Sequence, residues 1–295
     1  MKRVSKKLAN KQTQILDSFT VEKIKDWRKT GNIFVRIQAE LYASLAAQRS
    51  VVQERLLKAL SSSASESLEF NNWVRIVPYE YSDMPLSVKG SILSDPGGRF
   101  NIGEIDDFRF PRFSALYVAE NRKTAMAEYF GQSGAESGLE PHEFSLRDTR
   151  SISIVSVRGK LDSYLDLTSA ASLKLFVSIA KHFKVPNQLR SLAKKLGIKP
   201  ARVIESEAEL MTSLLDPDWR ALPAIAGVPA NCQTFGHFVQ ASGIEGILFP
   251  SVRGEANCLA IFPINFRGTA SFVEILPPHP HYVTQPRIDA TLPKV

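Results

Sequence analysis

The residues best suited to chemistry lie between positions 97 and 128. Gly97 and Gly98 predict a turn that lets a ligand or the facing chain approach closely. Arg99 follows with a planar guanidinium suited to phosphate oxygens. Tyr117 lies in a short apolar segment, and Glu128 follows on a predicted helix, so both side chains are expected near one strand end, where clefts form. Each signal alone is also compatible with a solvated arginine, a half-buried tyrosine or a surface glutamate.

A further polar group follows a predicted buried strand near position 250. Ser251 and Arg253 lie in a Pro-Ser-Val-Arg string, but the Gly-x-Ser-x-Gly elbow of serine hydrolases is absent. The five histidines lack metal-ligand spacing, and neither a Walker motif nor a Rossmann fingerprint occurs, so ATP hydrolysis and hydride transfer are unsupported. Glu120 competes with Glu128 for a carboxylate role, but its place beside a helix cap indicates a helix-dipole partner.

The first 60 residues carry apolar side chains at helical spacing. Gly31-Asn32 predicts a break between two helices, and the small residues at 61–65 predict a connector at a domain boundary. We expect this prefix to be a helical cap docked on the following domain. The alternative is an arm that binds a partner protein.

From position 73 onward, strands and helices alternate. Strands are predicted at 73–78, 116–118, 151–157, 247–249, 259–262 and 271–276, and helices at 124–130, 169–183, 187–196, 203–215 and 235–242. Asn121 is the expected N-cap of the helix at 124–130, Gly131 its expected end, and the tail beyond 277 is expected to be extended. The order predicts an α+β fold, with a helical extension at 1–66 and a catalytic domain at 67–295 that contains a helical insertion at about 169–235.

The composition is that of a soluble globular protein, with 44% hydrophobic and 23% charged residues. No run approaches the roughly 18 apolar residues of a membrane span, and no apolar core follows the basic N-terminus as in a signal peptide. Cys232 and Cys258 lack metal-ligand companions, so we expect free thiols, no metal and a cytoplasmic location.

The net charge of +7 is concentrated near the N-terminus and at 174–202. Such patches suit nucleic acid, an acidic protein or an anionic metabolite. Neither zinc-finger spacing nor an RNP-like string is present, so direct nucleic-acid binding is disfavoured. A basic enzyme that captures a dinucleotide, or an acidic partner protein, explains the charge equally well.

Taken in order, these motifs resemble the RES-domain family, named for its Arg, Glu and Ser. The family pattern opens with an arginine-containing strand, similar to residues 74–77, and continues with Gly-Gly-Arg-aromatic-Asn, a strand tyrosine and a helical Ala-x-x-Glu ending here at Glu128. Asp-Leu-Thr at 166–168 and Pro-Ser after a glycine-led strand complete a resemblance over about 72–276. The spacer from Asn101 to Tyr117 and the region 169–235 are longer than in compact members, and the prefix 1–70 has no counterpart in the short ones.

The resemblance implies an ADP-ribosyltransferase-like mixed β core and a bacterial toxin that consumes NAD as its substrate. The residues that match the family's catalytic positions are Arg99, Tyr117, Glu128 and Ser251. Further substrate-binding candidates are Arg75, Gly98, Asn101 and Arg253.

The expected chemistry needs a single carboxylate, because nicotinamide leaves its pyridinium as a neutral base that requires no proton. Glu128 would steady the positive charge that develops on the ribose. Arg99 would hold the pyrophosphate or the nearby ribose, Tyr117 would pack on nicotinamide, and Ser251 would fix the ribose or the carboxamide.

Water, inorganic phosphate or a protein side chain remain open as the acceptor, giving a glycohydrolase, a phosphorylase or an ADP-ribosyltransferase. A module that binds protein or nucleic acid without catalysis is the alternative. The resemblance also implies a cognate antitoxin with an Xre-like helix-turn-helix part. The N-terminal helices could then serve as a cover or as an arm that forms a homo-oligomer.

Overall fold

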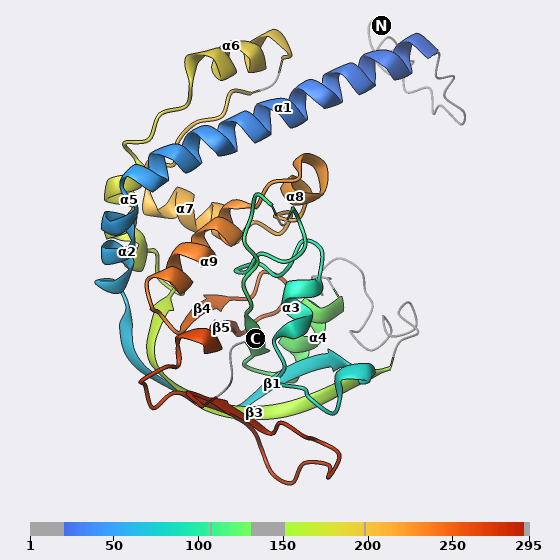
Figure 1. The fold of residues 1–295 in the computed structure, drawn as a ribbon, viewed down its shortest axis with the longest axis vertical. Coiled ribbons are helices and arrows are strands. Elements are labelled where there is room, and N and C mark those ends of the chain that lie inside the picture. Colours follow the sequence, from blue (N-terminus) through green and yellow to red (C-terminus); the bar gives the residue numbers. More distant parts are fainter. Residues whose placement is uncertain (1–20, 107, 131–150, 198, 292–295) are drawn as a thin grey trace, which may run out of the picture.

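The fold combines a mixed β-sheet with helices that cover one side of it (Figure 1). The computed structural model describes residues 21–106, 108–130, 151–197 and 199–291. The helices are α1 (Val21–Val51), α2 (Gln53–Ser61), α3 (Lys89–Leu93), α4 (Arg122–Phe130), α5 (Lys174–Ala180), α6 (Asn187–Lys195), α7 (Glu207–Leu214), α8 (Ala221–Ala226) and α9 (Asn231–Ala241). The strands are β1 (Ser65–Pro78), β2 (Leu116–Ala119), β3 (Ile152–Asp166), β4 (Gly246–Pro250), β5 (Asn257–Ile261), β6 (Phe272–Ile275) and β7 (Arg287–Asp289).

The strand pairings close a ring. The order is β1-β2-β5-β4-β3-β6-β7, and β1 also pairs with β3, so that the first five strands return to their start. The pair β3–β4 is parallel and the others are antiparallel. The predicted α+β fold with a mixed β core is therefore confirmed.

Alternation along the strands separates two hydrophobic cores. On β2, Leu116 and Val118 pack in one cluster with Leu259 and Ile261 of β5. Tyr117 points to the other face, toward the cluster shared with the helices. Because successive strand residues point to opposite faces, this alternation places Tyr117 on the helix side of the sheet. The functional site described below lies on that side.

The helices α2, α5, α7 and α9 lie between α1 and the sheet (Figure 1). Leu56 and Leu60 of α2 are fully buried in the same cluster as Phe235 of α9 and Phe249 of β4. Full burial of each such leucine stabilises the fold by roughly 1.5–3 kcal/mol. The second helix of the prefix is thus part of the main hydrophobic core.

Helix α1 packs against both α6 and α8. Ala39 and Tyr42 of α1 contact a small cluster that includes Phe110 and Val228. The rings of Tyr42 and Phe110 meet edge to face, with 5.1 Å between their centroids. The extension therefore contacts both the long spacer that precedes β2 and the helical insertion.

Several predicted boundaries were wrong. Gly31-Asn32 does not break the prefix: α1 continues through it to Val51, and the change of direction occurs at Val52. A single glycine costs a helix interior only about 1 kcal/mol, which packing on both sides of α1 offsets. The helix expected at 169–183 is a 3₁₀ turn (Ala170–Leu173) followed by the shorter α5.

Two strands are longer than predicted and one was missed. β1 begins at Ser65, and a register shift between Phe70 and Trp73 interrupts its alternation. β3 runs on to Asp166, and the tail expected to be merely extended contains β7, which pairs with β6. α8, with Pro223 in its interior, was also missed. Gly131, the expected end of α4, lies outside the described residues, whereas the Asn121 cap is confirmed by its Oδ1, which accepts from the Thr124 N–H at 2.8 Å.

Candidate active site

A cavity of about 380 Å³ collects most of the predicted site residues. Its walls come from β1, β2, α4, the loop before Phe100, the segment between α7 and α8, and the β4–β5 region. The predicted residues that line it are Arg75, Gly98, Arg99, Tyr117, Glu128 and Arg253. A second cavity, of about 370 Å³, contains none of the predicted residues. The first cavity is therefore the candidate active site.

The glycine pair is required by the shape of its loop. Gly97 has φ +101°, a conformation that residues with a side chain rarely adopt. A Cβ on Gly98 would lie 2.5 Å from the Tyr117 Oη and 2.6 Å from the Asn101 Oδ1. The loop can approach the strand tyrosine only because this position has no side chain.

Asn101 and Tyr117 hold this loop against β2. The Tyr117 hydroxyl donates to the Asn101 Oδ1 at 2.9 Å and accepts from the Phe100 N–H at 2.9 Å. The Asn101 Oδ1 also accepts from the Gly98 N–H, and its Nδ2 donates to the Ser91 and Phe113 carbonyls. Asn101 is fully buried and does not line the cavity, so its amide supports the loop.

Tyr117 lines the cavity, and its hydroxyl makes hydrogen bonds to the loop. Burial raises the pKa of this hydroxyl above its ordinary value, which keeps it protonated and able to donate. Because both hydroxyl bonds are used within the loop, contact of Tyr117 with a planar ligand falls to its ring. The predicted packing of nicotinamide on Tyr117 is compatible with this arrangement.

Gln233 of α9 clamps the same loop from the other side, and sequence reasoning missed it. Its Nε2 donates to the carbonyls of Pro96 at 2.8 Å and Asn101 at 3.0 Å, and more weakly to Gly98 at 3.3 Å. Its Oε1 accepts from the Ala230 N–H at 3.1 Å. A buried glutamine after a small-residue stretch gives little signal in a sequence, because its partners are backbone carbonyls far along the chain.

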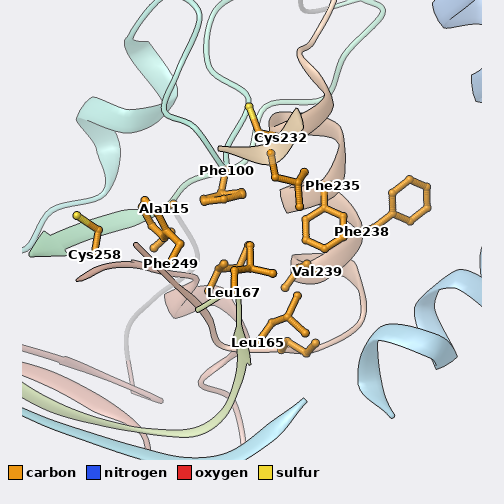
Figure 2. Packing of buried hydrophobic residues seen from close by; sticks show 14 of the residues in the cluster. Phe100, Ala115, Leu165, Leu167, Cys232, Phe235, Phe238, Val239, Phe249 and Cys258 are labelled. Atoms are coloured by element: carbon orange, nitrogen blue, oxygen red, sulfur yellow. The ribbon is translucent and has the colours of Figure 1, made fainter. Parts of the chain in front are cut away.

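Phe100 anchors the loop in the main core. Figure 2 shows its ring among Phe249 of β4 and Cys232 and Phe235 of α9. Phe100 is fully buried, and its centroid lies 4.9 Å from that of Phe249 in an edge-to-face arrangement. The residue next to Arg99 is therefore fixed by hydrophobic packing, which leaves the arginine little freedom at its base.

Arg99 is itself only 6% exposed. Its Nη1 donates to the carbonyls of Leu214 at 3.0 Å and Asp216 at 2.8 Å, which are the last residue of α7 and a residue just after this helix, in the insertion. Burial lowers the pKa of its guanidinium, an effect that the nearby Glu128 carboxylate partly opposes. The Nε and Nη2 atoms make no hydrogen bond within the described residues, and they are the atoms that can face a ligand.

Glu128 and Ser251 meet although 123 positions separate them. The Ser251 Oγ donates to the Glu128 Oε1 at 2.5 Å and accepts from the backbone N–H groups of Arg253 at 3.1 Å and Gly254 at 2.8 Å. Ser251 does not line the cavity, and these bonds use its donor and its acceptor sites. Its geometry is that of a residue that positions the glutamate.

The rival carboxylate, Glu120, has a hydrogen-bond partner that the sequence did not predict. Its Oε2 accepts from the backbone N–H of Asn257 at 3.0 Å, which joins the end of β2 to the start of β5. Glu120 does not line the cavity. The predicted interaction with the dipole of α4 stays a prediction beside this bond.

Arg75 lines the cavity, but its guanidinium donates hydrogen bonds to backbone carbonyls. Its nitrogens donate to Pro85 at 2.6 Å, Tyr117 at 3.0 Å and Ser87 at 3.1 Å. Burial lowers its pKa to about 10, so the group still carries a positive charge at neutral pH. Arg75 therefore ties β1 to β2 and adds a fixed charge beside the cavity.

Two further cavity residues, Trp219 and Arg220, were missed by the sequence analysis. Trp219 is only 4% exposed, and the Arg220 guanidinium carbon lies 4.4 Å from the centre of its ring. They follow the Asp-Pro-Asp string at 216–218, a turn signal that separates α7 from α8. A tryptophan and an arginine directly after such a turn were the available clue, but nothing in the sequence showed that the insertion reaches the cavity.

The cavity carries an excess of positive charge. Among the residues that the structure describes, its lining includes four arginines (Arg75, Arg99, Arg220 and Arg253) and one carboxylate, Glu128. Among the described residues, no group of three or more His, Cys, Asp or Glu side chains is placed to hold a metal ion. Both cysteines are buried free thiols, and burial raises the pKa of each. The lining favours a ligand that carries negative charges for the arginines and one positively charged group near Glu128.

The comparisons with known proteins agree with the motif order. The model of the RES domain matches residues 72–285. The chain belongs to the RES-domain family. The RES domain thus begins inside β1 and ends just before β7, so that α1 and α2 precede it.

Among solved structures, the fold is similar to the crystal structure of the M. tuberculosis MbcT–MbcA toxin–antitoxin complex, with 14% identity and a TM-score of 0.44. The match covers 76% of this chain and 92% of that chain. No curated protein matches the chain. Within the described residues of this RES protein, no helix is long and apolar enough to cross a membrane.

Proposed function

We propose that this RES-domain protein is a toxin that breaks the bond between nicotinamide and ribose in NAD⁺ and thereby depletes the cell of NAD. The observation that carries the proposal is the pairing of one serine-held carboxylate, Glu128, with an arginine-rich cavity wall. NAD⁺ has complementary features, since two phosphates carry negative charge and the pyridinium carries positive charge.

The reaction requires little proton transfer. Nicotinamide departs as a neutral base, and the bonding electrons return to its ring while positive charge develops on the ribose. Glu128 would stabilise this charge from a position that the short bond from Ser251 fixes in advance. Tyr117 would pack on the nicotinamide ring, and Arg99, held by the carbonyls of α7, would hold the pyrophosphate or the adjacent ribose.

The acceptor distinguishes three reaction types. Water would give ADP-ribose, inorganic phosphate would give ADP-ribose 1″-phosphate, and a protein side chain would give a modified protein. Incubation of the purified chain with NAD⁺, with and without phosphate, followed by mass analysis of products, separates these outcomes. An unchanged NAD⁺ pool in every incubation would contradict the proposal and would favour a binding module without catalysis.

Replacement of the carboxylate tests the assignment of Glu128. Glu128→Gln should reduce turnover about a hundredfold or more, because the charge-stabilising group is lost while the remaining oxygen still accepts from Ser251. Glu120→Gln is the matched control, since this carboxylate lies outside the cavity lining. Parent-like turnover of purified Glu128→Gln would disprove the role of this residue.

The family also suggests a partner, and we propose a cognate antitoxin with an Xre-like DNA-binding part and a cytoplasmic site of action. None of the described residues of α1 lines the cavity, so a role of this helix as a direct cover is not favoured. Copurification with the product of an adjacent gene, and rescue of growth by its coexpression, would test the partnership.

A further inference from the structure

The arginines of the cavity fall into two pairs. Arg75 and Arg99 donate to backbone carbonyls and are thereby fixed. Arg220 and Arg253 also line the cavity, but their guanidinium groups make no hydrogen bond or ion pair within the described residues. This second pair has its full set of donors available to a ligand.

Arg220 rests on a rigid platform. Its guanidinium lies over the ring of Trp219, 4.4 Å from the centroid, and Trp219 is almost fully buried. Stacking of this kind orients the planar fork without using its N–H donors. Directly after Arg220 begins α8, which packs against α1.

Arg253 is held at its backbone rather than at its side chain. Its N–H and that of Gly254 donate to the Ser251 Oγ, which is itself bonded to Glu128. Thr124 of α4 lies so close to Gly254 that a Cβ there would approach it to 2.8 Å. The turn that carries Arg253 is thus packed tightly on α4.

Arg220 and Arg253 line the same cavity, so their two unpaired positive charges act on one another. Burial is the largest cause that lowers the pKa of the Arg220 guanidinium. The charge of Arg253 and then that of Arg99 lower this pKa further. Two like charges in one partly desolvated wall are unfavourable until an anion binds between them.

We propose that Arg220 and Arg253 form a clamp for the two phosphates of the dinucleotide, with Trp219 as the support of Arg220; this rests on the proposed function. A diphosphate diester carries one negative charge on each phosphate, which matches one guanidinium for each. The clamp joins the helical insertion to the β4–β5 turn. The insertion is then a component of the binding site and not an appendage to it.

The test uses a ligand that contains the diphosphate but lacks nicotinamide. Calorimetry with ADP-ribose should show that Arg220→Gln weakens binding about tenfold or more, the usual loss for a charge-assisted hydrogen bond. Binding of AMP, which has one phosphate, should change by less than about threefold. The ADP-ribose affinity of Arg220→Lys should lie between those of the parent and Arg220→Gln, because lysine retains the charge but lacks the planar fork.

A matched control and a turnover assay complete the test. Arg190→Gln, on the exposed side of α6, should bind ADP-ribose as the parent does. With NAD⁺ as substrate, Arg220→Gln should raise KM about tenfold and change kcat by less than about threefold. Thermal melting establishes that each variant is folded.

The outcomes separate the two proposals. Parent-like ADP-ribose binding by Arg220→Gln, or no ADP-ribose binding by the parent, would overturn the clamp. If the parent binds ADP-ribose but consumes no NAD⁺, and Arg220→Gln selectively loses ADP-ribose binding, the result would support the clamp and contradict the proposed reaction. Parent-like KM in Arg220→Gln, with an active parent, would contradict the clamp alone.

Discussion

Replacement of Gln233 by leucine tests whether the Gly97–Asn101 loop is held by the helical insertion. Gln233 is fully buried, and its amide makes two short bonds to the loop, to the carbonyls of Pro96 and Asn101, and one bond to the Ala230 N–H. Leucine has a similar volume but satisfies none of these groups. The change therefore leaves backbone groups buried without partners.

The expected magnitude follows from these three bonds. At about 1 kcal/mol for each, Gln233→Leu should lower the free energy of unfolding by about 3 kcal/mol. For a chain of this size that corresponds to a fall of about 6 °C in Tm. The chain should remain folded, because domains are commonly stable by about 5–15 kcal/mol.

The assay measures stability and turnover on the same preparation. Chemical denaturation should show the loss of stability, and NAD⁺ turnover should fall because the loop carries Arg99. Gln240→Leu is the control: this residue is on the same helix, and its side chain makes no hydrogen bond within the described residues. If Gln233→Leu unfolds at the same denaturant concentration as Gln240→Leu, the clamp by Gln233 is refuted.

Two further predictions concern the site and its pH dependence. Ser251→Ala should lower kcat about tenfold, because Glu128 loses the 2.5 Å bond that fixes its position. The loss should be smaller than in Glu128→Gln, since the carboxylate itself remains. Steady-state kinetics with equal kcat in Ser251→Ala and the parent would contradict the positioning role. Burial, followed by the charge of Arg49, lowers the pKa of His237 in the folded state. As the pH falls, the unfolded state therefore binds the proton first, and the free energy of unfolding should decrease below about pH 6.5. Thermal melting at about pH 7.5 and 5.5 should show a smaller decrease for His237→Gln than for the parent, and equal decreases would exclude His237 as a cause.

The parts of the fold that could be predicted are those with local signals. The short strand around Tyr117 and the Asn121 cap were recognisable because alternation and capping depend on near neighbours. The lengths of β1 and β3 were not, since these strands are stabilised by pairing with each other and not by their own pattern. Gly31 failed as a helix end for the same reason, because α6 and α8 support α1 on both sides.

The site shows the same division between local and distant information. Arg99, Tyr117 and Glu128 line one cavity as their motif order suggested, although their catalytic roles remain predictions. Gln233 and Arg220 were missed because their importance depends on which distant segment they meet. The sequence showed that Ser251 follows a strand, but only the fold shows that its hydroxyl is used by Glu128 and two backbone N–H groups.

The way in which Arg99 is anchored bears on how this protein can diverge. Its guanidinium is held by the main-chain oxygens of Leu214 and Asp216, which every amino acid possesses. The identities of these two side chains therefore do not enter the contact with Arg99, and Leu214 is restricted instead by its full burial in the main core. For this one contact, a comparison of related sequences would find no polar side chain that changes together with the arginine, because its partners are main-chain oxygens.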